Sequence, residues 1–127
     1  FEGGRTRGKR MEAAAAVNER RAELEDLRGR IDMEVRDALL DLAAASQQLE
    51  AVTTTTSLAG QQLAQARDRF AAGVAGNLEV TQAQEAVAAA SDQYIDSLYR
   101  HNLAKASLAR AVGTAEQAVT AFLGGTK

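Results

Sequence analysis

Small and apolar side chains recur at every third or fourth position through much of the chain, and this spacing restricts the fold more than any other feature of the sequence. In the first half the steps of four and three continue for more than five heptads, with one polar exception. The run consists of Ile31, Val35, Ala38, Leu42, Ala45, Leu49, Val52, Thr56, Ala59, Leu63, Ala66 and Phe70. Because a repeat of 3.5 residues places these side chains on one face of an α-helix, the pattern is typical of a coiled-coil seam. The sequence therefore predicts one long helix over about residues 7–71.

The composition favours such a rod over a compact globular core. The 127 residues include no tryptophan and no cysteine, and aromatic residues make up only 4%. Because few side chains are large, a globular core would bury little apolar area and would be weak. The formal net charge of −2 argues against a nucleic-acid-binding protein. The absence of cysteine is compatible with many compartments, the periplasm included.

The segment 52–57 is the weakest part of the predicted helix. Its four consecutive threonines lower helix propensity, because they are branched at Cβ and their hydroxyl groups compete for backbone hydrogen bonds. Gly60 adds a further local cost. Two structures remain open for this segment, a kink or bulged turn and a continuous helix.

The strongest break in the helical pattern lies at residues 72–77, where Gly73 and Gly76 give the backbone conformational freedom. Asn77 is a favourable N-cap, and the acidic Glu79 follows in the first turn of the next helix. Beyond the turn, small and apolar positions again alternate by three and four. They are Val80, Ala83, Val87, Ala90, Tyr94, Ser97, His101, Ala104, Leu108 and Ala111. A second helix is therefore predicted over about residues 77–112.

Two heptad-patterned helices joined by a short turn form an antiparallel hairpin. We expect the second helix to stop at Gly113, and Thr114 to cap a short third helix over about residues 115–123. The predicted fold class is thus all-α: a long antiparallel coiled-coil helical hairpin with a short C-terminal helix. A free hairpin with such unequal arms would leave part of the first helix uncovered. We therefore expect the chain to be part of a longer protein or of an oligomer.

Three segments resemble, in the right order, the second repeat of TolC-type outer-membrane efflux proteins. Residues 1–4 resemble the start of the long helix of that repeat, and residues 108–113 resemble the close of its returning helix. Residues 69–84 resemble its tip. The shared features there are an aromatic residue, a glycine, a leucine with an acidic residue and an Ala-Gln pair, here Phe70, Gly73, Leu78, Glu79, Ala83 and Gln84. The resemblance covers nearly the whole chain.

The resemblance implies a periplasmic helical hairpin of a homotrimeric protein of the cell outer membrane. Proteins of this family form a β-barrel in that membrane and an α-helical barrel across the periplasm, through which compounds are exported. This chain would be part of the α-barrel, and contact with the membrane would be made only by a β-barrel that this sequence does not include. In the family, hairpin tips dock periplasmic adaptor (membrane fusion) proteins, which connect the channel to an inner-membrane pump. The tips also narrow the channel entrance.

By the same resemblance, the adaptor-docking tip consists of Gly73, Val74, Ala75, Gly76, Asn77 and Leu78. Glu79 and Gln82 are the candidates for the channel entrance. Relatives often carry acidic residues there that form a cation-sensitive constriction. Because Gln82 is neutral, the acidic ring that the resemblance implies has fewer carboxylates here, with only Glu79 from each hairpin. Phe70 stands where a tyrosine is usual before the tip, so a contact through a hydroxyl group is lost.

Two groups of charged residues each allow two interpretations. The arm between Arg69 and Arg100 contains no lysine or arginine, so it either lines a channel with negative potential or is an ordinary solvated helix face. Its acidic residues are Glu79, Glu85, Asp92 and Asp96. The N-terminal basic cluster consists of Arg5, Arg7, Lys9 and Arg10. No aromatic platform or nucleic-acid motif accompanies this cluster, which favours a solvated helix start over a site for nucleic acid or anionic lipid.

The sequence offers no parts for catalysis, for a cofactor or for a metal site. His101 is the only histidine, it lies on the seam, and no cysteine or suitably spaced carboxylate accompanies it. Tyr94 and Tyr99 are five residues apart and cannot share a helix face. No serine–histidine–aspartate set and no phosphate-binding loop is present. We therefore expect that the chain is not an enzyme.

Two other functional classes remain open. A stand-alone Ala-rich coiled-coil module without a transport role would carry the same seam, and a second, similar hairpin in the gene would argue against it. A protein whose helices lie on a lipid surface is disfavoured, because the seam is narrow and lacks the wide apolar face that such helices use.

Overall fold

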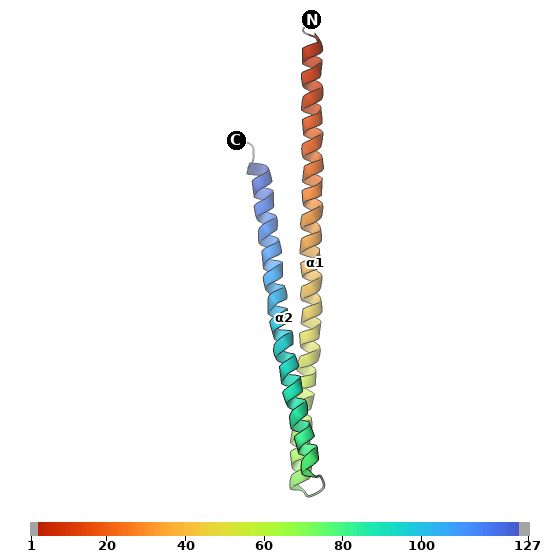
Figure 1. The fold of residues 1–127 in the computed structure, drawn as a ribbon, viewed down its shortest axis with the longest axis vertical. Coiled ribbons are helices and arrows are strands. Elements are labelled where there is room, and N and C mark those ends of the chain that lie inside the picture. Colours follow the sequence, from red (N-terminus) through yellow and green to blue (C-terminus); the bar gives the residue numbers. More distant parts are fainter. Residues whose placement is uncertain (1–2, 125–127) are drawn as a thin grey trace. The chain divides into compact units, whose positions relative to one another are not determined.

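The computed structural model describes residues 3–124, which form two α-helices joined by a short turn (Figure 1). Helix α1 spans Gly3–Ala71, and helix α2 spans Asn77–Gly124. No strand occurs in this part of the chain. The predicted all-α helical hairpin is confirmed.

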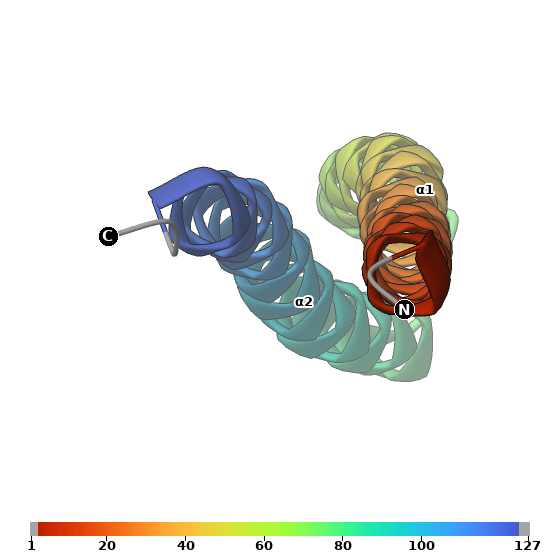
Figure 2. The same cartoon turned by 90° about the horizontal axis from the view of Figure 1, so that it is seen from above.

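Both helices are uninterrupted, and the ribbons in Figure 2 are accordingly unbroken coils. The expected end of the second helix at Gly113 is therefore wrong, as is the separate short helix over residues 115–123. A glycine inside a helix costs only about 1 kcal/mol relative to alanine. The half-buried Ala111, Ala115 and Ala118 continue the spacing of three and four past Gly113, so the packed face persists. Helix α1 also begins earlier than expected, at Gly3 rather than near residue 7.

The threonine segment is a continuous part of α1, which decides between the two structures left open for it. The hydroxyl groups of residues 53–56 each donate a hydrogen bond to the carbonyl oxygen four residues earlier, at 2.7–3.2 Å. These bonds satisfy the hydroxyl groups while the backbone keeps its helical bonds. Branching at Cβ therefore lowers the local helix propensity without breaking the helix.

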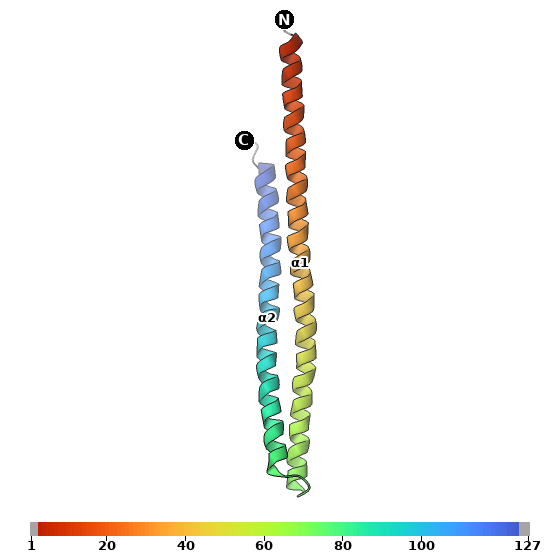
Figure 3. The same cartoon turned by 45° about the vertical axis from the view of Figure 1, so that its right-hand side comes forward.

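The chain divides into two compact units, which are described separately. The first comprises residues 38–108 and contains the turn. Figure 3 shows its two helical segments side by side, α1 in yellow to lime and α2 in green to light blue. The second unit comprises, within the described residues, 3–37 and 109–124.

In the first unit the predicted seam lies between the two helices. Every predicted seam residue over 38–66 and over 80–108 is buried or half-buried. The least exposed side chains are mostly alanines, and they are Ala38, Val52, Ala59, Ala66, Ala90 and Ser97. Phe70 is the exception, with 49% of its surface exposed. It lies one residue before the end of α1, where the chain begins to turn and the opposite helix has not yet started.

A hydrogen bond between the helices defines their register. Thr56 Oγ1 donates to Ala90 O at 3.2 Å, in addition to its bond to Val52 O within α1. Counting seam positions outward from this contact places a small residue of one helix opposite a larger residue of the other at almost every level. The pairs are Ala38 with Leu108, Leu42 with Ala104, Ala45 with His101, Leu49 with Ser97, Ala59 with Val87, Leu63 with Ala83 and Ala66 with Val80. Such pairing fills the space between the helices evenly along their length.

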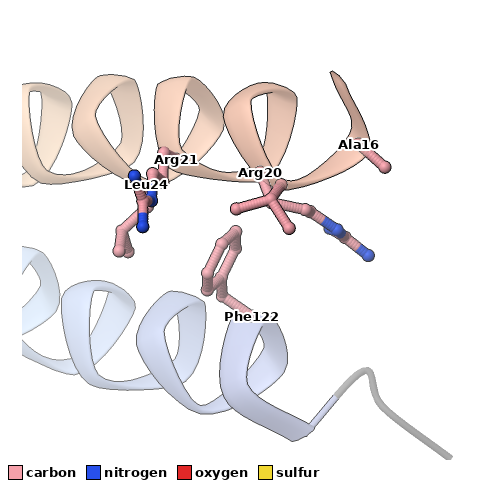
Figure 4. Close-up of a pocket in the computed structure, with 6 residues that line it drawn as sticks. Ala16, Arg20, Arg21, Leu24 and Phe122 are labelled. Carbon is pink, nitrogen blue, oxygen red and sulfur yellow. The ribbon is translucent and has the colours of Figure 1, made fainter. Parts of the chain in front are cut away.

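In the second unit the end of α2 packs against α1 through the half-buried Phe122. Figure 4 shows its ring pointing toward α1, near Leu24 and Arg20. Arg20 Cζ lies 5.8 Å from the centre of the ring, which is within range of a cation–π interaction. Together with Ala16 and Val17 these side chains line a shallow apolar groove. The part of α2 beyond Gly113 is thus stabilised by the packing of Phe122 against α1.

Candidate functional site

Backbone hydrogen bonds close the turn at residues 72–76. Gly73 N–H donates to Phe70 O at 3.0 Å, and Val74 N–H donates to Arg69 O at 3.0 Å. With Gly73 in the left-handed region at a φ of 73°, these two bonds form a Schellman motif, which satisfies carbonyl groups at the end of α1. A Cβ atom disfavours this backbone conformation. The turn therefore has a specific geometric need for glycine at position 73.

The N-cap position of helix α2 lies one residue before the predicted one. Asn77 is the first residue of α2, and Glu79 N–H donates to Gly76 O at 3.2 Å. The N-cap residue is the one before the first helical residue, and its carbonyl already accepts a bond of the first turn. Gly76 therefore occupies the N-cap position, which corrects the expectation for Asn77. Glycine is tolerated at this position, although it provides no side-chain bond to the helix.

Three large apolar side chains remain exposed beside the turn. Val74 is 67% exposed, Leu78 is 70% exposed and Phe70 is 49% exposed. We call these three side chains the tip apolar residues. Ala75, between them in sequence, is half-buried. The tip apolar residues stand on or next to a turn with a fixed hydrogen-bond pattern, so another chain can cover them without first ordering the backbone.

An ion pair joins the two helices next to the turn. Arg69 Nε lies 3.4 Å from Glu79 Oε1, and the two side chains are 58% and 42% exposed. The predicted site did not include Arg69. Counting from the turn does not identify this ion pair, because the seam register places Asn77 rather than Glu79 level with Arg69. Glu79, predicted for the channel entrance, is thus paired with a cation of its own chain.

Gln82, the second entrance candidate, lines the same polar groove as this ion pair. The other lining residues are Gln62, Gln65, Ala66, Ala83 and Ala86. Glutamine side chains donate and accept hydrogen bonds but carry no charge. Of the residues that the structure describes, Arg69 and Glu79 are therefore the only charged ones that line the groove.

The acidic residues of the returning arm differ in their surroundings. Asp96 Oδ2 accepts a hydrogen bond from Arg100 Nε at 2.9 Å, one helical turn further on. Glu79 pairs with Arg69, as described above. Glu85 and Asp92 are exposed. The negative potential of this arm is consequently smaller than the number of its carboxylates suggests.

The remaining candidate residues lie in the seam or form no cluster. His101 and Tyr94 are half-buried between the helices of the first unit. Within residues 3–124, no group of three or more histidine, cysteine, aspartate or glutamate residues is placed to hold a metal ion. No stretch of the described helices has the length and hydropathy needed to cross a membrane.

The sequence matches one known protein family. The family model described as outer membrane efflux protein matches residues 1–114, which include the turn and most of both helices. Searches of curated proteins and of solved structures found no significant match. The chain therefore belongs to the outer membrane efflux protein family, a family of transport channels of the outer membrane and periplasm rather than of enzymes.

Proposed function

We propose that this chain forms the periplasmic α-barrel portion of a trimeric outer-membrane channel for efflux or type I export. In this proposal the hairpin tip docks a periplasmic adaptor protein, which links the channel to an inner-membrane pump, and the tip also forms the channel entrance. Members of the family generally form trimers and work with adaptor proteins. The family match over residues 1–114, which includes the whole turn, is the observation that carries the proposal.

The tip apolar residues support the docking role. Val74 and Leu78 keep about the same large fraction of their surface in water, although the Schellman motif fixes the backbone at Val74 and Leu78 lies in the first turn of α2. Exposed apolar side chains that gather at one place on a protein are typical of an interaction site. A partner that covers them gains apolar burial at little cost in conformational entropy.

Apolar residues on the outer faces of the first unit support contact with neighbouring chains. Leu40, Leu58, Ile95 and Tyr99 have between 53% and 66% of their surface exposed, and none of them belongs to the seam. A hairpin of two helices covers only one face of each helix. These side chains therefore stay in water unless further helices pack against them, as in a barrel built from several hairpins.

The proposed role is structural and conductive, without a catalytic step. Alanines in the seam let the two helices approach closely. Each of them buries less apolar surface than a valine or leucine, whose complete burial contributes roughly 1.5–3 kcal/mol. The stability of a channel wall built this way depends on many weak contacts together, including those with neighbouring chains.

Photocrosslinking from the tip of the full-length protein tests the docking role. A photoreactive amino acid at Val74, or at Leu78 in a second variant, should capture a periplasmic adaptor. Ile95 is a matched control, because it is apolar and 64% exposed but lies eighteen residues after the start of α2. A crosslinker at Ile95 should capture a second copy of the same chain instead.

Adaptor capture from both tip positions and not from Ile95 would support the proposal. Equal capture from Ile95 would contradict it. So would an absence of capture from the tip in a protein whose circular dichroism remains helical, and that outcome would favour the stand-alone coiled-coil role.

A further inference from the structure

We infer that Arg69 is a specificity-determining residue of the channel entrance, because it neutralises Glu79 within each chain and so keeps the entrance from carrying a ring of negative charge. This inference rests on the proposed function, in which the tips of several chains surround the entrance. It concerns the same site and specifies whether the entrance favours cations.

The two charged groups are so close that their electrostatic potentials largely cancel at the position of an ion in the entrance. Arg69 Nε and Glu79 Oε1 are 3.4 Å apart. At distances much longer than this separation the pair acts as a dipole, whose potential falls more steeply than that of a single charge. Both side chains are about half exposed, so a passing ion senses the pair, or whichever partner remains after a substitution.

The net charge of the groove around the ion pair depends on Arg69 and Glu79 alone, within the described residues. Among the described residues, the polar neighbours that line the same groove are Gln62, Gln65 and Gln82, and all of them are neutral. The groove is therefore neutral with both partners present. It carries one negative charge without Arg69 and one positive charge without Glu79.

The charged residues that precede Arg69 point to other faces of α1. Successive residues of an α-helix are rotated by about 100°, so Asp68 lies about 100° and Arg67 about 200° around the helix from Arg69. Both are exposed. Arg67 carries the same charge at nearly the same height on the opposite face, which makes it a matched control.

Rings of carboxylates favour cations in channels, because their negative potentials add at the axis. Three unpaired Glu79 side chains would form such a ring in a trimer. With Arg69 beside each of them, the potentials cancel chain by chain, and the entrance does not select cations at this level.

Ion selectivity of the full-length channel in planar lipid bilayers tests the inference. In a potassium chloride gradient, Arg69→Gln should shift the reversal potential toward cation selectivity. It should also strengthen block by La³⁺ about tenfold or more, which is the lower end of the effect of charge focusing in a cleft. Glu79→Gln should shift the reversal potential in the opposite direction, because it leaves Arg69 unpaired. The double variant should return to wild-type behaviour.

Arg67→Gln removes the same charge from the opposite face and should leave selectivity and block near wild type. The inference is overturned if Arg67→Gln acts as strongly as Arg69→Gln, or if Arg69→Gln has no effect on a conducting channel. The second result would leave the proposed function intact. A folded full-length protein that forms no conducting channel at all would overturn the proposed function, and this inference with it.

Discussion

The seam and the tip of the hairpin are stabilised in different ways. Along the seam, the register places small side chains of one helix opposite larger ones of the other at almost every level. At the tip, the stabilising features are local: a glycine with a φ of 73°, a pair of capping hydrogen bonds and an ion pair between the two helices. The seam supplies most of the buried surface of the first unit. The tip supplies the left-handed glycine and the ion pair that joins α1 to α2.

A shift of the helices by one heptad shows why this difference matters. In α1 one seam position of each heptad is mostly alanine and the other is mostly a larger residue, and in α2 the small and large positions have the complementary order. Sliding by seven residues would therefore again place small opposite large at most levels. Packing along the seam tolerates more than one register. The turn and the hydrogen bond from Thr56 to Ala90 O select one of them.

Of the substitutions considered, replacing a buried seam alanine by a larger residue should lower the stability of the hairpin most. Ala90 is 5% exposed and its carbonyl oxygen lies 3.2 Å from Thr56 Oγ1, so Ala90→Leu must push the helices apart. We expect a loss of about 1–3 kcal/mol in the free energy of unfolding. Urea unfolding of the chain, followed by circular dichroism at one fixed protein concentration, measures it.

Ala89→Leu is the control for this substitution, because Ala89 is the preceding residue and is exposed. We expect it to change stability by no more than about 0.5 kcal/mol. Equal losses for the two variants would mean that the close approach of the helices at Ala90 does not exist.

Replacement of glycine by alanine should have opposite effects on stability at the tip and inside α1. Gly73→Ala places a Cβ on a residue with a φ of 73°, and the expected loss is about 1–2 kcal/mol. No atom lies within 4 Å of that Cβ, so the cost comes from the backbone conformation and not from a clash. Gly60→Ala lies inside α1, also with open space around its Cβ, and should stabilise the chain by about 0.5–1 kcal/mol. Destabilisation by both substitutions, measured by the same unfolding curves, would contradict this account of the turn.

Much of the fold could be predicted from the sequence, because a seam is a periodic feature and periodicity is visible in one dimension. Every predicted seam position over 38–66 and 80–108 is buried or half-buried, although Ser91 and Ser107 are half-buried outside the seam. The expected stop at Gly113 was wrong because a glycine changes the local helix propensity by only about 1 kcal/mol. Packing of Phe122 in the second unit belongs to the tertiary structure and overrides so small a preference.

The tip was less predictable, because its interactions depend on geometry across the turn. The glycines marked the reversal, yet the left-handed φ belongs to Gly73 and the N-cap position to Gly76 rather than Asn77. The ion pair required knowing which residues face each other. The seam register places Asn77 level with Arg69, so counting along the sequence does not pair Arg69 with Glu79, and the ion pair becomes visible only in the structure.

Removing the hydroxyl group of Thr56 should weaken the selection of one register. Thr56→Val keeps the branched shape but loses the hydrogen bond to Ala90 O, and we expect a loss of about 0.5–1.5 kcal/mol. Thr53→Val is the control, because that hydroxyl group bonds to Leu49 O within α1 and is exposed. The unfolding free energy should fall more for Thr56→Val than for Thr53→Val. Equal changes would show that the bond between the helices contributes nothing to the hairpin.

The ion pair at the tip should have the smallest effect on stability, and that is what makes it a good test of charge. Both partners are about half exposed, and ion pairs of this kind contribute at most about 1 kcal/mol. Arg69→Gln and Glu79→Gln should each lower the unfolding free energy by about 0.5 kcal/mol or less, and the difference from wild type should shrink in about 1 M salt, where the screening length is about 3 Å. A loss well above 1 kcal/mol would mean that the pair holds the tip together, and changes in ion selectivity could then follow from a distorted turn. A small, salt-sensitive loss leaves the turn intact, so that any change in selectivity reports the charge of Glu79 itself.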